Sequence, residues 1–308
     1  MSGSNVAQLG YQSLLACGPS PASFTRSFVF VSEGVQKTGV ITERQGLRGT
    51  RTHQVQDTRQ DKYTVAGSLV IEPTAEDLAF WLPYMLGTGT GGTYTLTESL
   101  PTFSLAVTRG ADRFQYDGCK IGVWTLAASK GDPIPKLTLE IHGQTETRTL
   151  GAGLPSGAPA LAYTPPYIFT DLTLDLATVA RQVESFSLKC DHQLITDRFM
   201  NSLTVVDLPE QDRIITLDVE LGYTTNNADL YGVALAGVAG SLTLAQSNGM
   251  TGSYAATTAI TFSKLQIPDK SPVVGGRQEI MLPLNFACRS ADGTANDEMS
   301  VSHSYSGS

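Results

Sequence analysis

The sequence predicts a mainly β protein in which one strand-and-helix unit occurs twice. Three observations support this prediction: a repeated polarity pattern, a polar but weakly charged composition, and a glycine- and proline-rich segment near the middle of the chain. The repeat relates residues 63–82 (YTVAGSLVIEPTAEDLAFWL) to residues 215–234 (ITLDVELGYTTNNADLYGVA), which align without a gap. A repeat of this period indicates two similar units in tandem.

Each copy of the repeat begins with residues that alternate between apolar and polar. In the second copy, the alternation places Leu217, Val219 and Leu221 on one side, with Asp218 and Glu220 on the other. The first copy alternates in the same way. This period indicates a strand with one buried face and one wet face.

Each predicted strand is followed by the start of a helix. In the first copy, Thr74 can cap the helix and Asp77 stands three residues later, as in a capping box. Pro83 is predicted to end this helix early, and Gly87 is a natural stop signal. The second copy repeats the cap, the acid and the glycine between Asn226 and Gly237.

The composition supports a β-rich fold and argues against a nucleic-acid binder. Hydrophobic residues make up 41% and charged residues only 16%, so Thr, Ser, Gln and Asn must cover much of the surface. Such a surface is usual for β-rich proteins. The net charge of −8 argues against a protein that binds nucleic acid by neutralising its phosphates, since that mode needs clustered Lys and Arg.

The cysteines and the apolar runs indicate a protein made and kept in cytosol-like conditions. The four cysteines are far apart and form no CxxC pair, so we expect buried or incidental free thiols. The sequence shows no signal peptide. Its longest apolar run, residues 78–86, contains a proline and is much shorter than the roughly 20 residues that cross a bilayer. We therefore expect no membrane contact.

Changes in composition along the chain predict its division into parts. Residues 1–25 are expected to form an N-terminal arm, and residues 26–150 the first unit. The Gly-, Pro- and Ala-rich residues 151–166 are predicted to be a linker. Residues 167–290 then form the second unit, and residues 291–308 a polar C-terminal tail.

Two segments lack a core-forming pattern and are predicted to project from the units. Residues 43–62 are polar and carry mixed charges, whereas residues 192–213, at the equivalent position, are more apolar. Long segments of this kind are often functional. We predict that they dock onto a partner subunit, where mixed charges set register more than affinity; a solvated flexible loop is the alternative. The candidate contact residues are Arg44, Arg48, Arg51, Arg59, Phe199 and Met200.

The sequence contains no set of residues that predicts an enzyme or a cofactor site. The four histidines lack metal-ligand spacing, and His53 and His192, in the projecting segments, are expected to be solvated. Residues 87–92 (GTGTGG) match a dinucleotide-binding pattern, but they follow a helix and precede a strand, so we predict a turn. Asp218 and Glu220 share a strand face, and a solvated polar face is favoured over a glycosidase pair.

Several motifs together resemble the major tail tube proteins of long-tailed, siphovirus-like bacteriophages. The motifs span most of the chain, and it is their combination that is specific. They are the polar loop with Gly46-Leu-Arg48 and Gly49-Thr-Arg51, the strand end G-S-L-x-I-E-P-T (67–74), the helix D-L-x-x-W-L with a terminal L-G (77–87), the segment D-R-F-x-Y-x-G-C (112–119), and the late segment S-P-V-V-x-G-R-x-E-I (271–280).

The resemblance implies two tandem β-sandwich or barrel units of the tail tube type, each with one short flanking helix. It also implies a structural virion protein, assembled in the host bacterial cytoplasm, that polymerises into stacked rings forming the tail tube. Rings of this family usually contain six units. A chain with two units would form trimeric rings with pseudo-sixfold symmetry, and hexameric rings are the alternative. The implied partners are the chain itself, the tape measure protein, and the tail terminator and tip proteins.

The polar strand faces fit a channel through which DNA passes without specific binding. Asp218, Glu220 and, near the equivalent end in the first copy, Glu72 are the candidates for lining this lumen. Acidic groups there would repel the phosphate backbone and prevent capture. The alternatives are another virion β-protein, such as a tail-tip or connector component, a two-domain β-sandwich ligand-binding protein, or a carbohydrate-active enzyme.

Overall fold

The protein folds as a mainly β structure, as the sequence predicts. The structure is a computed structural model, and it describes residues 9–46, 49, 51–87, 89–224, 227, 230, 236–246, 255–268, 271, 272, 274 and 279–305. Among these residues there is one α-helix, α1 (Ala75–Met85), and three short 3-10 helices, η1 (Gly10–Gln12), η2 (Val55–Asp57) and η3 (Phe169–Asp171).

All the strands pair antiparallel and belong to one connected network. The strands in chain order are β1 (Leu15–Gly18), β2 (Arg26–Phe28), β3 (Ser32–Glu33), β4 (Gln36–Glu43), β5 (Thr58–Ile71), β6 (Thr93–Thr95), β7 (Phe103–Arg109), β8 (Asp112–Ser129), β9 (Asp132–Gly143), β10 (Thr145–Thr149), β11 (Leu172–Leu176), β12 (Val179–Arg181), β13 (Val183–Asp191), β14 (Ile214–Gly222), β15 (Val238–Gln246), β16 (Ala256–Gln266), β17 (Met281–Arg289) and β18 (Met299–Tyr305).

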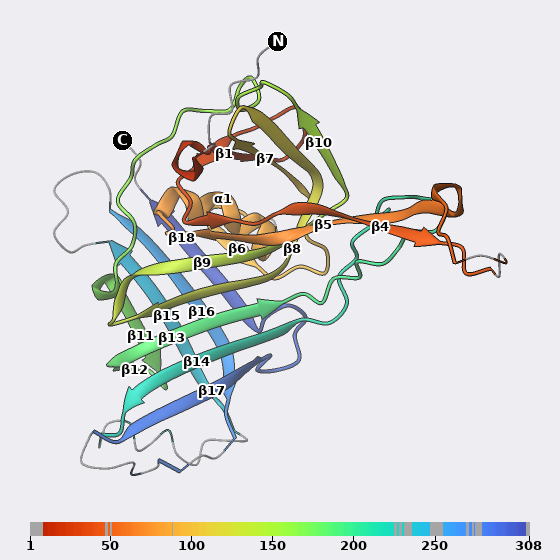
Figure 1. Ribbon diagram of the computed structural model, residues 1–308. Helices are drawn as coiled ribbons and strands as arrows, with labels where there is room; N and C mark the ends of the chain where they lie inside the picture. The colour runs from red at the N-terminus through yellow and green to blue at the C-terminus, as the bar shows by residue number, and fades with distance from the viewer. Residues whose placement is uncertain are drawn as a thin grey trace.

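The front layer of the molecule is a run of six neighbouring strands in the order β5, β9, β8, β13, β14 and β17 (Figure 1). The pairing of β8 with β13 joins a strand from the first half of the chain to a strand from the second half. We refer to these six strands as the main sheet. Their inward side chains, such as Leu139, Trp124, Leu188, Leu217 and Phe286, are almost completely buried.

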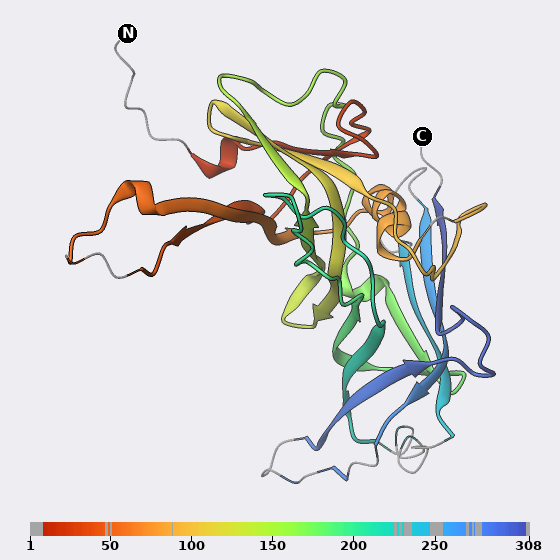
Figure 2. The same cartoon turned by 90° about the vertical axis from the view of Figure 1, so that its right-hand side faces the viewer.

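Apart from β3 and β4, which pair with β5, the remaining strands form a second layer that packs behind the main sheet (Figure 2). In the first half of the chain the order is β2, β1, β7, β8 and β10, and β8 is long enough to take part in both layers. In the second half the order is β12, β11, β15, β16, β18 and β6. One hydrophobic core connects the layers of both halves.

Helix α1 starts as the sequence predicts. The Thr74 hydroxyl accepts a hydrogen bond from the Asp77 backbone N–H at 3.2 Å, and the Asp77 carboxylate accepts one from the Thr74 N–H at 3.1 Å. Arg26 of β2 also donates to the Asp77 carboxylate. These bonds fix the helix start against the sheet, and Trp81 on its inner face is completely buried.

The prediction that Pro83 ends α1 early was wrong, because the helix continues to Met85. Pro83 removes one backbone hydrogen bond, but the helical path continues past it, and the Leu86 N–H still donates to the Leu82 carbonyl at 3.0 Å. Gly87, with φ of 131°, then takes the chain out of the helix as expected. The second predicted helix begins at Asn226, and most of that segment lies outside the described residues.

Both predicted terminal segments contain core strands. Within the predicted N-terminal arm, β1 lies between β2 and β7, and its residues Leu15, Ala16 and Cys17 are completely buried. Within the predicted C-terminal tail, β18 pairs with β16 and β6, and Met299 and Val301 are buried. The chain ends that were predicted to be extended therefore contribute to the fold.

The four cysteines are free and buried, in agreement with the sequence-based prediction. Burial raises the pKa of all four thiols, and the pKa of Cys288 rises to about 12. A thiol whose pKa is raised by burial is a poor nucleophile, so these residues act as small apolar side chains of the core.

Candidate assembly surfaces

The outward face of the main sheet is polar because each of its strands alternates. Asp218 and Glu220 both lie on this face, with Asp218 exposed and Glu220 partly exposed. The Asp218 carboxylate accepts a hydrogen bond from Asn285 of β17, and Ser185 of β13 donates to Glu220 at 3.4 Å. A shallow groove of about 700 Å³ runs across the face between these strands and the end of the β8–β9 hairpin, where Lys136 lies.

Glu72, the third predicted lumen candidate, follows β5 at the other side of the main sheet. Its charge contributes to raising the pKa of Lys136, although the larger cause is the hydrogen bond from Lys136 to Asp132. Glu72 is separated from Asp218 and Glu220 by β9, β8 and β13. The three acids are therefore spread across the sheet and do not form one cluster.

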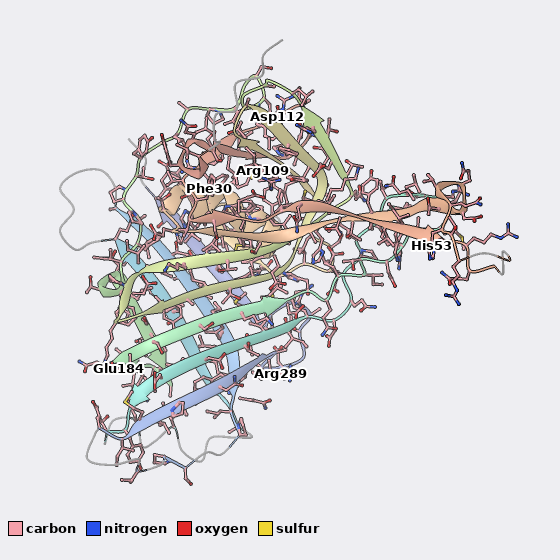
Figure 3. The ribbon with its side chains drawn as sticks, in the orientation of Figure 1. Phe30, His53, Arg109, Asp112, Glu184 and Arg289 are labelled. Carbon is pink, nitrogen blue, oxygen red and sulfur yellow. The ribbon has the colours of Figure 1, made fainter. Side chains whose placement is uncertain are left out.

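The structure adds acidic residues to this face that were not selected from the sequence. Glu140 of β9 is exposed and lies opposite Ser68 of β5. The alternation in the sequence could have indicated Glu140. Leu139 and Ile141 beside it belong to the core, and an alternating strand must turn Glu140 outward. Glu184 lies at the far end of β13 (Figure 3), where it pairs with Lys130. Charged residues on or at the rim of this face include Glu72, Lys130, Asp132, Lys136, Glu140, Glu184, Lys189, Asp191, Asp218, Glu220 and Arg289, with acids in excess.

The first projecting segment is the end of a long β-hairpin formed by β4 and β5, which extends away from the body of the molecule (Figures 1 and 2). We refer to residues 36–66 as the arm. Almost all of β4 is exposed, and Val55 near the tip is 82% exposed. A solvated hairpin with exposed apolar residues gains little stability from contacts within its own chain. This geometry is therefore typical of a segment that contacts a partner.

The second projecting segment, residues 192–213, lies beside the base of the arm. It folds back on itself through backbone hydrogen bonds, with the Val206 N–H donating to Arg198 at 3.0 Å. The Tyr63 N–H of β5 donates to the Leu203 carbonyl at 2.9 Å, and the Lys62 ammonium lies 4.8 Å from the centre of the Phe199 ring. Segments that are far apart in the sequence thus form one projection.

The predicted contact residues are brought partly together. Arg44, Arg59 and Phe199 line one groove of about 680 Å³ between the arm and the second segment. Met200 lies on the same segment and is 94% exposed. Arg51 is exposed near the tip of the arm, and Arg48 lies outside the described residues.

The prediction of a solvated His192 was wrong, whereas His53 is exposed on the arm (Figure 3) and contacts Glu43 at 2.7 Å. The His192 side chain is buried, and its Nε2 lies 3.0 Å from the Met85 carbonyl oxygen. Its backbone N–H donates to Gly122 at 2.8 Å. His192 therefore holds the root of the second segment against the end of α1.

Acidification is expected to destabilise the fold through its buried histidines. Burial lowers the pKa of His192, His142 and His303 below the usual 6.5. Just below pH 6.5 the unfolded chain binds protons that the folded chain does not. The contribution of these histidines to the free energy of unfolding is therefore greatest above pH 6.5, and it decreases as the pH drops. Urea denaturation from pH 7.5 to pH 5 should show this fall, with a slope of at most about 1.4 kcal/mol per pH unit for each histidine.

The variant His192→Gln tests the contribution of this one residue. The glutamine amide can still donate to the Met85 carbonyl but does not titrate, so the variant should show a shallower pH dependence. The unmodified protein, measured in parallel, is the reference for this slope. An unaltered slope in His192→Gln would contradict the assignment.

Neither a cluster of metal ligands nor a membrane-spanning helix is found among the described residues. In this part of the chain, no three His, Cys, Asp or Glu side chains come together as metal ligands would. None of its helical segments has the length and apolar character of a membrane span.

The two surfaces define the class of the protein. An extended polar sheet face and a projecting arm are features of a structural protein that acts through contacts with other chains. A family profile described as phage tail tube protein matches residues 5–288, and the chain therefore belongs to the phage tail tube protein family. It is a non-enzymatic structural component of the virion tail, and membership of the family implies self-assembly. No curated protein matches the sequence.

Proposed function

We propose that the chain polymerises into stacked rings that form the tail tube and enclose a channel for DNA. The observation that carries this proposal is the β8–β13 pairing, which continues the main sheet from one half of the chain into the other. A tube wall needs sheets that continue from unit to unit, since an open edge would otherwise remain at every unit. The chain contains one such junction within itself.

The strand pairings support two tandem units of one type. In the first half β1 pairs with β2 and β7, β5 with β4 and β9, and β8 with β7, β9 and β10. In the second half β11 pairs with β12 and β15, β14 with β13 and β17, and β16 with β15, β17 and β18. Each of these seven pairings of the first half has a counterpart in the second, in the same chain order, whereas the short β3–β5 pairing has none among the described residues.

Two units per chain support a trimeric ring with pseudo-sixfold symmetry. The halves differ in what they project, because only the first carries the arm and the second supplies the segment that packs beside it. A ring built from three chains therefore has three arms. Such closed rings of head-to-tail contacts stack into an open filament when one ring face fits the next.

The polar face of the main sheet is proposed to line the channel. Glu72, Glu140, Asp218 and Glu220 would then present negative charge to the DNA backbone, which favours passage over capture. The arm and the second segment are proposed as the contact between rings, with Arg44, Arg51, Arg59, Phe199 and Met200 at or near it. The tape measure protein inside the tube, and the terminator and tip proteins at its ends, are the further partners of such a tube.

Negative-stain microscopy of the purified protein tests this function. The expected result is hollow tubes, or stacked rings with a central channel, at high protein concentration. Isolated rings that never stack would favour a tail-tip or connector component. A protein that stays monomeric at high concentration would contradict self-assembly.

A further inference from the structure

The root of the arm carries backbone groups that do not bond to a strand. The Gly34 N–H donates to the Ser68 carbonyl of β5 at 2.8 Å. Residues of an antiparallel strand alternate in the edge to which they direct these groups, so Val35 directs its own N–H and C=O away from β5. Among the described residues, β3 and β4 pair with no strand other than β5. Val35 is completely buried, so its backbone groups need other partners within the protein.

One ion pair supplies both partners. The Glu33 carboxylate accepts a hydrogen bond from the Val35 N–H at 2.6 Å, and the Arg109 guanidinium donates to the Val35 carbonyl. Arg109 also pairs with Glu33, its Nη2 lying 2.8 Å from each carboxylate oxygen. The ion pair therefore takes the place of a neighbouring strand at the root of the arm. We refer to Glu33, Val35 and Arg109 as the root clamp.

The body of the molecule holds the Arg109 side chain in place. Arg109 is the last residue of β7 and lies beside the root of the arm (Figure 3). Its Nη1 donates to the Tyr116 hydroxyl at 2.9 Å, and its guanidinium carbon lies 5.1 Å from the centre of the Phe114 ring. Tyr116 is completely buried in the core. Arg109 thus joins the arm to the second layer.

The second segment holds the other edge of the arm. The pairing of β5 with β9 ends where Val65 lies opposite Gly143. Beyond that point, the Tyr63 N–H donates to the Leu203 carbonyl at 2.9 Å. Tyr63 lies opposite Gly39, which is further along the arm than Val35. The arm is therefore held at two separate points on opposite edges, and this arrangement resists rotation of the hairpin in the plane of its strands.

We propose that Arg109 is a positioning residue, because the root clamp fixes the direction of the arm before assembly. This inference rests on the proposed function, in which the arm makes the contact between rings. A segment that is already held in its bound direction loses less conformational freedom when it binds. If release of the clamp leaves the arm correctly directed in about one tenth of the molecules, tubes should require about ten times more protein.

The variant Glu33→Gln/Arg109→Met releases the root clamp without leaving a buried charge. The glutamine can still accept from the Val35 N–H, whereas the methionine cannot donate to the Val35 carbonyl. Removing Arg109 alone would leave the Glu33 carboxylate, whose side chain is 4% exposed, without its ion-pair partner, and such a change destabilises a fold.

The matched control is Asp112→Asn/Arg148→Met. It also removes an arginine–carboxylate pair, and the Arg148 guanidinium carbon lies 5.7 Å from the centre of the same Phe114 ring. Asp112 belongs to β8 and Arg148 to β10, so neither is part of the arm. The two variants therefore differ in whether the lost pair contacts the root of the arm.

Distances between two spin labels measure the direction of the arm in dilute, unassembled protein. The labels are attached to Ile41→Cys on the arm and Lys189→Cys on β13, both of which are exposed positions. The native cysteines are buried and so are protected from the label. We expect one narrow distance distribution in the otherwise unmodified protein and in the control, and a broad one in Glu33→Gln/Arg109→Met. An equally narrow distribution in that variant would overturn the proposal.

Assembly is measured on the unlabelled variants as the protein concentration at which tubes appear in electron micrographs. Glu33→Gln/Arg109→Met should need more protein, in proportion to the lost fraction of correctly directed arms, and the control should not. A broad distance distribution with tubes at the usual concentration would overturn the role of the clamp in assembly. If the unmodified protein forms neither rings nor tubes, the proposed function fails, whereas the distance measurement still decides whether the clamp directs the arm.

The variant Arg109→Lys provides the test if Glu33→Gln/Arg109→Met does not fold. Lysine keeps a positive charge beside Glu33, but its single ammonium cannot reproduce the planar set of donors that holds Glu33, Val35 and Tyr116 together. The expected result is a folded protein with a broadened distance distribution. A distribution as narrow as that of the unmodified protein would show that Arg109 does not position the arm.

Discussion

Replacing residues 41–61 with Asn-Gly is expected to give a folded protein that forms rings but no stacked tubes. Val40 and Lys62 lie opposite each other in the arm, and a two-residue Asn-Gly turn joins such a pair with the correct strand twist. The removed residues that the structure describes are almost all exposed, so the shortened protein should still fold. Electron microscopy and sedimentation would measure the loss of tubes.

The control for this variant keeps the arm and changes only its tip. Val55→Ser removes one exposed apolar side chain and should reduce tube length without abolishing tubes. If the shortened arm gives tubes of normal length and abundance, the arm does not carry the contact between rings. A shortened protein that neither stacks nor closes into rings would place the arm in the lateral contact.

The strongest periodic signals in the sequence predicted individual strands of the main sheet, but not the β8–β13 pairing that joins its two halves. The alternation around Leu217 predicted β14 and the face to which Asp218 and Glu220 belong, and the pair Thr74 and Asp77 predicted the start of α1. These signals are local, because a strand face or a helix cap depends on residues within a few positions. The structure forms both as the sequence indicated.

The sequence did not reveal contacts that join distant parts of the chain. Residues 15–18 are too few to show a period, and they become a core strand only because Phe28 and Val107 lie on either side of Leu15. His192 is buried by the end of α1, which is distant in the sequence. The joining of the two projecting segments rests likewise on long-range contacts, from Tyr63 to Leu203 and from Lys62 to Phe199.

The double variant Asp218→Lys/Glu220→Lys is expected to assemble normally and to delay DNA passage. Each substitution changes the charge by two, so the net charge of the chain rises from −8 to −4, with the change confined to the polar face of the main sheet. For each added lysine that neutralises a phosphate, the decrease of the logarithm of DNA affinity with the logarithm of salt concentration becomes steeper by about 0.9. Ejection from assembled particles, followed with a DNA-binding dye, should therefore be slow at 50 mM salt and recover toward the normal rate at 200 mM.

Recovery in salt distinguishes an electrostatic lining from damage to the wall. A distorted tube would be slow at every ionic strength, whereas captured DNA is released as counterions compete for the phosphates. The matched control is Glu98→Lys/Asp292→Lys, which makes the same change in net charge at two exposed positions outside the main sheet. If this control delays ejection as much as the Asp218/Glu220 variant, net charge alone is responsible. A delay that appears only with the Asp218/Glu220 variant and recovers with salt means that this face of the sheet meets the DNA.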